Sequence, residues 1–176
     1  AQIIYEDGSG TMWNSLFECG EFELVQDVFY EGNSSIKISW DKGKGCEWIG
    51  FGNSFSNWAP TNVAEYRNEK ALSFFVRTQN GSTGGIPIVL GLEDFSGGGS
   101  YLFTEAKKYL YGLNIDTTWK QMIVPMWHFP IGNEPENDDI DIAAVKQLKF
   151  QLEGAGSYYL DEIKLIDYSK EEYEKM

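Results

Sequence analysis

The segment Ala71–Thr78 reads ALSFFVRT, and its alternating side chains indicate a β-strand that is buried on one face. Successive side chains of a strand point to opposite sides of a sheet, so every second residue shares a face. The segments Ile86–Asp94 and Gln147–Glu153 alternate in the same way, and polar side chains on their other face are typical of an antiparallel sheet with one wet side. The residues expected in the core are Leu72, Phe74, Val76, Ile88, Leu90, Leu92, Leu148, Phe150 and Leu152.

Similar short segments, rich in β-branched and aromatic residues, follow one another along the chain between glycine and asparagine turns. They are Ile3–Glu6, Glu21–Val25, Ser35–Trp40, Glu47–Phe51, Tyr101–Glu105, Trp119–Pro125 and Tyr158–Asp167. Short strands with turn signals at this spacing predict an all-β sandwich or barrel. A helical period of 3.6 residues occurs only briefly, near Thr104–Tyr111 and Ile142–Gln147.

The composition excludes several classes of partner. The chain has 176 residues, which is typical of one domain. Its 14 Lys and Arg against 27 Asp and Glu give a net charge of −13, whereas a protein that follows nucleic-acid phosphates needs clustered Lys and Arg. No apolar run approaches the roughly 18 residues of a membrane-spanning helix. We therefore expect no nucleic acid and no membrane among its partners.

Histidine and cysteine are scarce: the chain has one histidine, His128, and two cysteines, Cys19 and Cys46. These scattered residues do not supply the three or four spaced ligands of a zinc site. The two cysteines are equally compatible with one disulfide, as in an exported protein, and with two free buried thiols.

A catalytic role would need paired carboxylates or an activated nucleophile. The E-x-D-x-x-E motif of laminarinase-type sandwich glycosidases does not occur, and no G-x-S-x-G elbow accompanies His128. Glu93 and Glu153 could still meet on one face, so a small β-sandwich hydrolase or lyase remains an alternative. The acidic run Glu134–Asp141 lacks the spacing of a calcium-binding loop and is interpreted as a solvated loop.

The aromatic residues are the most informative class, because a rigid apolar ring with a polar edge suits the face of a sugar. Trp40 and Trp119, at the end and the start of expected strands, are interpreted as core residues. The face on which Trp48 lies is ambiguous, because its neighbours Ile49 and Phe51 would make the opposite face apolar. The tryptophans that are candidates to face a ligand are Trp13, Trp48, Trp58 and Trp127.

Several stretches in order along the chain are similar to one known family. They are Ile4–Gly8 (IYEDG), Gly32–Trp40 (GNSSIKISW), Trp48 with Gly50, Ala71–Arg77 (ALSFFVR), Asp116–Pro125 with Phe129 (DTTWKQMIVP…F), Val145–Phe150 and Tyr159–Ile166 (YLDEIKLI). In these stretches the chain resembles the β-jelly-roll carbohydrate-binding modules, which are galactose-binding-like, and is closest to the family 11 type. The resemblance implies a β-sandwich jelly roll of two antiparallel sheets that binds a polysaccharide without catalysis.

The resemblance also implies a structural calcium ion away from the sugar cleft. Its expected ligands are Glu6 or Asp7, a carbonyl of Gly32 or Asn33, and Asp161, an oxygen-only set that suits calcium. A hydrogen-bonded network of acids is the alternative.

The chain departs from the family 11 pattern at two places near the expected cleft. Glu47, rather than an aromatic residue, precedes Trp48, and Trp127, His128 and the acidic loop stand where that family has a basic cluster. The ligand therefore need not be the mixed-linked glucan of family 11.

These observations together predict a carbohydrate-binding β-sandwich over residues 1–168 and a charged tail or linker remnant over 169–176. We expect a monomeric module of a secreted glycoside hydrolase that binds a β-glucan or related plant polysaccharide in a cleft. A protein-interaction module is a further alternative. The expected sugar-binding residues are Trp48, Trp58, Arg77, Glu93, Tyr101, Trp127, Gln151 and Glu153.

Overall fold

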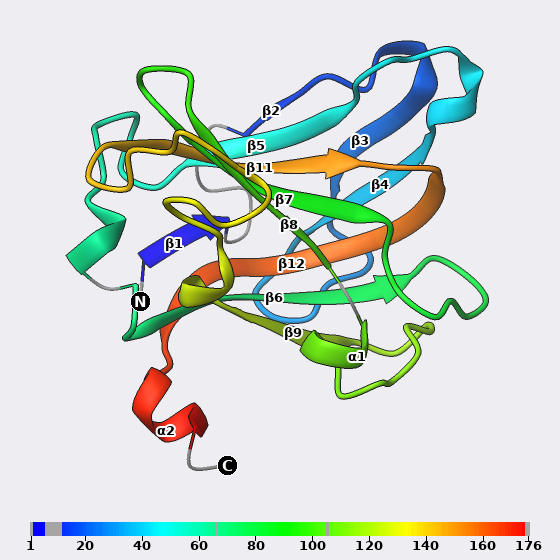
Figure 1. Cartoon of the computed structure of the whole chain (residues 1–176). Helices are drawn as coiled ribbons and strands as arrows, with labels where there is room; N and C mark the ends of the chain where they lie inside the picture. Colours follow the sequence, from blue (N-terminus) through cyan, green and yellow to red (C-terminus); the bar gives the residue numbers. More distant parts are fainter. Residues whose placement is uncertain (1, 6–11, 66, 105, 175–176) are drawn as a thin grey trace.

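The chain folds as a sandwich of two antiparallel six-stranded sheets (Figure 1). The structure is a computed structural model, and it describes residues 2–5, 12–65, 67–104 and 106–174. The strands are β1 (Gln2–Tyr5), β2 (Trp13–Asn14), β3 (Gly20–Val25), β4 (Ser35–Asp41), β5 (Gly50–Ser54), β6 (Lys70–Thr78), β7 (Ile88–Asp94), β8 (Gly99–Phe103), β9 (Lys120–Pro125), β10 (Asn137–Asp138), β11 (Val145–Leu152) and β12 (Ala155–Asp167). The predicted all-β sandwich of two antiparallel sheets is confirmed.

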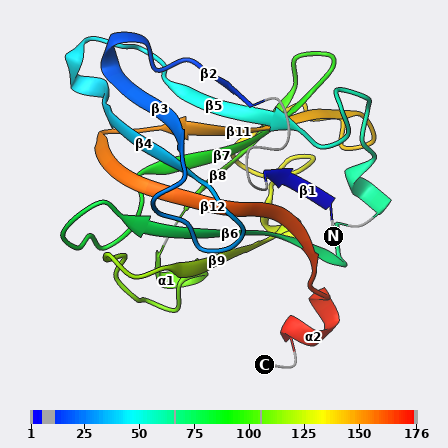
Figure 2. The same cartoon turned by 180° about the vertical axis from the view of Figure 1, so that it is seen from behind.

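One sheet, called here the β12 sheet, has the order β3-β4-β12-β6-β9, and β1 also pairs with β12 (Figure 2). The other, called the β11 sheet, has the order β10-β8-β7-β11-β5-β2. Most neighbours in each sheet are distant in sequence, because a jelly roll sends successive strands to opposite sheets.

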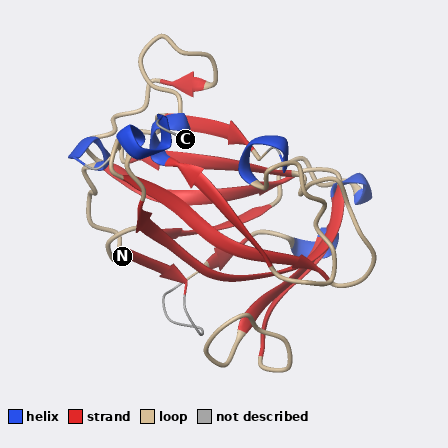
Figure 3. Ribbon diagram, turned by 90° about the horizontal axis from the view of Figure 1, so that it is seen from below, coloured by secondary structure: helices blue, strands red, loops and turns tan. Residues whose placement is uncertain are grey.

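Helices are few and short, and they lie around the rim of the sandwich (Figure 3). They are η1 (Phe17–Cys19), η2 (Lys42–Lys44), η3 (Val63–Glu65), α1 (Ala106–Tyr109), η4 (Met126–His128) and α2 (Lys170–Glu174). In the described part of the chain, none of them is long and apolar enough to cross a membrane. The tail expected after residue 168 contains α2, which extends away from the two sheets (Figure 1).

The hydrophobic core lies between the facing sheets, and the alternation of the sequence assigns it correctly. All nine residues expected there from β6, β7 and β11 are buried. Phe150 of the β11 sheet stacks on Phe51 with ring centroids 4.5 Å apart and meets Phe74 of the β12 sheet edge-on at 5.8 Å. The first contact joins neighbouring strands of one sheet, and the second crosses the interface and holds the two sheets together.

Some local expectations were wrong. The strand expected over Glu47–Phe51 begins only at Gly50, so Trp48 lies outside any strand. The helical period near Ile142–Gln147 gives way to β11 at Val145, because pairing with both β5 and β7 stabilises the extended chain there. Trp40 is buried as expected, but Trp119 is only half-buried and lies edge-on to Tyr30.

The two cysteines form a disulfide, which decides between the two possibilities that the sequence left open. Cys19 at the end of η1 is bonded to Cys46 between η2 and β5, and the bond closes a loop of 27 residues. The described part of the chain contains no free cysteine.

Replacing both Cys19 and Cys46 by alanine should lower the free energy of unfolding by about 3 kcal/mol, because the open chain gains entropy mainly in the unfolded state. Urea unfolding without reductant measures the change. Wild-type protein in the presence of a dithiol reductant should show a similar loss. A double variant as stable as the oxidised wild type would contradict the expectation.

Candidate functional site

The outward face of the β11 sheet carries an unusual combination of glycines, large rings and charged groups. The register places Gly52, Lys149 and Gly91 side by side on β5, β11 and β7, with Trp13 on one flank and Tyr101 on the other. Two residues along the strands, Gly50, Gln151 and Val89 form a parallel row. Period 2 points all of these side chains away from the core.

The glycines let two indole rings lie close against the sheet. A Cβ atom at Gly50 would lie 2.7 Å from Cη2 of Trp48, and one at Gly52 would lie 3.0 Å from Cζ2 of Trp13. Any larger residue at these positions would lift the rings, which is why a strand interior carries glycine there. The rings of Trp13 and Trp48 are nearly parallel, at an interplanar angle of 25°, with centroids 5.9 Å apart.

Tyr101 lies on the same face at the β8 edge in a similar way. A Cβ atom at Gly91 would come within 3.2 Å of its ring, and one at Gly99 within 2.5 Å of its hydroxyl oxygen. We call Trp13, Trp48 and Tyr101 the aromatic platform. It presents rigid apolar rings to solvent from two flanks of the sheet.

Two glutamines hold the indoles in place. Trp13 Nε1–H donates to Oε1 of Gln147 at 2.6 Å, and Trp48 Nε1–H donates to Oε1 of Gln151 at 3.0 Å. Gln147 in turn donates to Glu93 at 2.9 Å, and Gln151 donates to Glu153 at 2.7 Å. Each ring is thus connected through an amide to a carboxylate.

Lys149 lies between the two halves of the platform. Its Nζ is 6.0 Å from the ring centroid of Trp48 and 5.7 Å from that of Tyr101, so it interacts with both aromatic rings. It also donates to Oε2 of Glu93 at 2.8 Å, and its side chain is 15% exposed. Lys149 and Glu93 therefore put a charged donor and a charged acceptor in the middle of the face.

Both carboxylates of the face are held in the ionised form. Burial alone would raise the pKa of Glu93, but hydrogen bonds from Lys149 and Gln147 and the charges of Lys149 and Lys146 outweigh it and lower the pKa. The pKa of Glu153 is lowered by hydrogen bonds from Gln151 and Lys42. A glycosidase acid needs a raised pKa, so neither group has the environment of a proton donor.

The lowered pKa of Glu93 gives a pH-dependent contribution to stability. It is complete above the unfolded pKa of about 4.3 and is lost as the pH falls through the lower native value. We therefore expect Glu93→Gln to lower the free energy of unfolding at neutral pH. Below about pH 4, the free energies of unfolding of the variant and the wild type should be closer. Urea unfolding of both proteins at several pH values tests this. A difference in the free energy of unfolding that grows as the pH falls would contradict the expectation.

An open hollow adjoins the platform at Tyr101. It has a volume of about 450 Å³ and is lined by Val89, Tyr101, Phe103, Glu136, Gln151 and Glu153. Phe103 is 57% exposed there, which extends the apolar surface beyond the platform. The face thus offers rings to stack on and carboxylate, amide and ammonium groups to hydrogen-bond.

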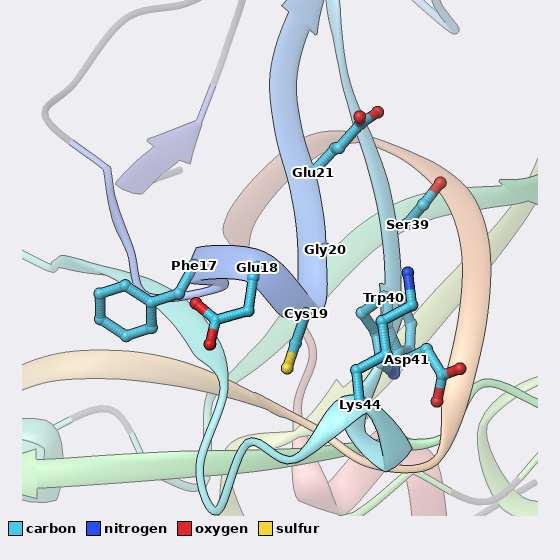
Figure 4. Close-up of a pocket in the computed structure, with 9 residues that line it drawn as sticks. All are labelled: Phe17, Glu18, Cys19, Gly20, Glu21, Ser39, Trp40, Asp41 and Lys44. Carbon is cyan, nitrogen blue, oxygen red and sulfur yellow. The ribbon is translucent and has the colours of Figure 1, made fainter.

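A second hollow, of about 470 Å³, lies where η1 meets β3 and η2 follows β4 (Figure 4). Three acidic residues, Glu18, Glu21 and Asp41, line it together with Lys44. It lacks the glycine floor and the tryptophans of the platform, so we do not assign the binding site to it.

The structure brings five of the eight predicted sugar-binding residues to the outward face of the β11 sheet. They are Trp48, Glu93, Tyr101, Gln151 and Glu153. Trp58 follows β5, and its backbone N–H donates to Oγ of Ser54 at 2.9 Å. Ser54 pairs with Gln147, so Trp58 belongs to the rim of this sheet.

Arg77 was expected on the same face, which was wrong, and Trp127 was expected at its rim. Arg77 lies on β6, in the other sheet, where its guanidinium stacks on Tyr159 at 5.1 Å. Trp127 is in η4, with its ring 6.0 Å from that of Tyr168, which follows β12. Alternation predicts that a residue points outward but not which sheet its strand joins.

The predicted set omitted Trp13, Gln147 and Lys149. The signal for the last two was present, because the alternation that turns Gln151 outward also turns these residues outward. Trp13 was a candidate ligand-facing residue, but only the pairing of the two-residue strand β2 with β5 places it beside Trp48.

Asp161, one of the expected calcium ligands, lies elsewhere, on the β12 sheet. Asp161 is buried on β12, where its Oδ2 accepts the backbone N–H groups of Tyr30 at 2.8 Å and Glu31 at 3.2 Å. It is therefore next to the turn of Gly32 and Asn33, as expected. Glu6 and Asp7 lie outside the described residues, and the described ones contain no group of three or more His, Cys, Asp or Glu that could hold a metal ion.

Comparison with known proteins agrees with this geometry. The family model for carbohydrate binding domain 30 matches residues 2–167. A crystal structure of a family 30 carbohydrate-binding module is 16% identical with a TM-score of 0.75, covering 96% of this chain and 88% of that one. The family 30 module of cellulosomal cellulase Cel9D-Cel44B of Clostridium thermocellum is 15% identical with a TM-score of 0.69, covering 94% and 96%.

The family 11 type, which the sequence resembles, has the same fold. The Clostridium thermocellum family 11 module in complex with a β-1,3-1,4-mixed-linked tetrasaccharide is 13% identical with a TM-score of 0.59, covering 96% of both chains. No curated protein sequence matches the chain. The resemblance to β-jelly-roll carbohydrate-binding modules is confirmed, and the family whose model matches is 30.

Proposed function

The chain belongs to the carbohydrate binding domain 30 family, and from this premise we propose that its aromatic platform binds a neutral β-linked glucan chain. It is a non-catalytic module that binds carbohydrate. The observation that carries the proposal is the seating of Trp13, Trp48 and Tyr101 on glycines of the β11 sheet. Flat, half-buried rings of this kind suit the apolar faces of β-linked glucose rings.

The polar groups between the rings would supply selectivity. Glu93 and Glu153, both ionised, would accept hydrogen bonds from sugar hydroxyls, and the ammonium group of Lys149 would donate to them. Because removing hydroxyls from water is costly, we expect micromolar to millimolar dissociation constants, or about −8 to −4 kcal/mol.

A neutral ligand is favoured by the charges of the face. The ammonium groups of Lys149 and Lys42 are already paired with Glu93 and Glu153, and the whole chain has a net charge of −13. An anionic polysaccharide would be repelled by such a surface. A cellulosomal cellulase carries one similar module, and another similar module forms a complex with a β-1,3-1,4-mixed-linked tetrasaccharide, which supports a plant β-glucan as the ligand.

The same reasoning supports a parent protein that is a secreted glycan-degrading enzyme. The Cys19–Cys46 disulfide fits an oxidising compartment outside the cytosol. The module would act there by raising the local concentration of substrate around the catalytic domain.

Affinity electrophoresis tests the proposal, with soluble mixed-linked β-glucan, hydroxyethyl cellulose, xyloglucan, mannan and pectin in the gel. We expect the two unbranched glucans to retard the protein and pectin to leave it unaffected, and calorimetry with cello-oligosaccharides then gives the affinity. Retardation by pectin alone, or by none of the polymers, would refute a neutral-glucan module. Release of reducing sugar from any polymer would refute the absence of catalysis.

The calcium site is a separate part of the proposal. We propose that the chain holds a structural calcium ion through oxygen ligands, which calcium prefers. The ligands would be Asp161, a carbonyl of Gly32 or Asn33, and Glu6 or Asp7. The position of Asp161 beside the turn after Tyr30 supports it. Its carboxylate faces away from the platform, on the other sheet, so the ion would not contact the sugar.

Calcium at about 100 times its dissociation constant should raise the melting temperature by about 5–10 °C over protein in a chelator, because binding to the native state alone adds about 2.7 kcal/mol. Asp161→Asn should abolish this difference. Asp167→Asn, an exposed acid on the same strand, should preserve it. Equal melting temperatures with and without chelator in the wild type would contradict the site.

A further inference from the structure

Trp48 is the platform residue with the least support from regular structure. It lies between η2 and β5, and within the described ranges the backbone of residues 46–48 makes no hydrogen bond. On one side, the nearest backbone hydrogen bond runs from the N–H of Gly45, just after η2, to the carbonyl of Lys42. On the other side, Leu152 N–H donates to the carbonyl of Ile49. A segment without such bonds is free to move unless something else fixes it.

The disulfide supplies a fixed point two residues before Trp48. Cys46 is bonded to Cys19, which is fully buried where η1 passes into β3 (Figure 4). Cys19 is itself tied to the fold, because its backbone N–H donates to the carbonyl of Leu16 and the next residue, Gly20, pairs with Trp40 of β4. The bond thus connects one end of the segment 46–48 to the hydrophobic core, while Ile49, which is fully buried, anchors the other end.

The same bond links the two segments that carry tryptophans of the platform. Trp13 precedes η1 and stacks beside Trp48, and the backbone N–H of Ser15 donates to the carbonyl of Gly50. Cys19 lies at the end of the segment that carries Trp13, and Cys46 lies at the start of the segment that carries Trp48. With the backbone held by the disulfide, the side-chain hydrogen bond to Gln151 orients the ring of Trp48.

We propose that Cys19 and Cys46 are positioning residues for carbohydrate binding: their disulfide holds the backbone of Trp48 so that its ring is already seated on Gly50 before the ligand arrives. The inference rests on the proposed function of the platform. A ring that must first be ordered loses affinity, because the ordering entropy is then lost on binding. The bond therefore acts on affinity through Trp48, and not only on stability.

Calorimetry with a cello-oligosaccharide tests the inference in a thermodynamic cycle. We expect Cys19→Ala/Cys46→Ala to weaken binding about tenfold under conditions where circular dichroism shows the variant to be fully folded. In a Trp48→Phe background the same double replacement should weaken binding less than threefold. In a Tyr101→Phe background, the matched control at the other flank, the tenfold loss should persist. An equal loss in all three backgrounds, or none in the first, would overturn the inference.

A second measurement is independent of any ligand. Protein labelled with 5-fluorotryptophan gives a fluorine signal for each tryptophan, and Trp48→Phe and Trp119→Phe assign two of them. Removing the disulfide, or reducing it with a dithiol that supplies two electrons and two protons, should shift or broaden the Trp48 signal. The Trp119 signal, from the far sheet, should not change. An unchanged Trp48 signal, or equal changes in both, would contradict the positioning role.

The two measurements separate this inference from the proposed function. If the wild type binds no glucan, the proposed function fails, while the fluorine spectra still report whether the disulfide positions Trp48. If the wild type binds and the disulfide-free variant binds equally well, the function stands and the positioning role is wrong.

Discussion

Replacing Trp48 by alanine should weaken glucan binding about 30-fold or more, the largest effect of a single side chain that we expect. A central aromatic residue that is held flat and surrounded by contacts typically contributes about 2 kcal/mol or more to binding. Trp48 meets these conditions, because it lies on Gly50, beside Trp13 and within 6.0 Å of Lys149, and Gln151 fixes its polar edge. Calorimetry with a cello-oligosaccharide measures the change.

Trp119→Ala is the matched control, because Trp119 is also half-buried but lies next to the β9 edge of the opposite sheet. Arg77→Ala, on the same sheet as Trp119, should also leave the affinity within twofold. If either control weakened binding as much as Trp48→Ala, the ligand would have to bind the β12 sheet, and our assignment of the face would be wrong.

Gly50→Ala should reduce both affinity and stability, although it adds only one methyl group. The new Cβ would lie 2.6 Å from the carbonyl oxygen of Phe150 and 2.7 Å from Trp48 Cη2, so both the ladder and the ring must shift. Overpacking of this kind costs about 1–3 kcal/mol of stability. We expect at least a tenfold loss of affinity in protein that remains folded, because the ring can no longer lie on the sheet.

Gly84→Ala is the control for this second prediction, since a Cβ there meets no atom within 4 Å. It should bind and unfold as the wild type does. Affinity and unfolding should be measured on the same samples, by calorimetry and by urea titration. A Gly50→Ala variant with wild-type affinity would show that Trp48 need not lie against the sheet.

Much of the fold is predictable from the sequence because strand alternation is a local property. Leu72, Phe74 and Val76 are buried as their spacing predicts. The prediction of a strand around Trp48 was wrong, because alternating residues do not guarantee that a segment finds strands to pair with. There the backbone before Gly50 is tied down by a disulfide, a contact that two isolated cysteines do not specify.

The candidate site was predictable only in part. Glu93, Tyr101 and Gln151 were selected as outward-facing residues, and they do meet on one face. Arg77 was selected by the same criterion and lies on the other side of the sandwich. Residues far apart in sequence share a face only if their strands join the same sheet in the right register, which alternation within one strand cannot reveal.

The sequence by itself therefore determined the class of fold, the inward and outward faces of each strand, and the family resemblance, because these depend on side-chain order along a single segment. The tertiary structure alone decided which outward faces combine, that glycines on β5 and β7 form the floor beneath three rings, and that Cys19 is bonded to Cys46. These features depend on long-range strand pairing, in which the hydrophobic effect and the backbone hydrogen bonds of the whole chain select one arrangement.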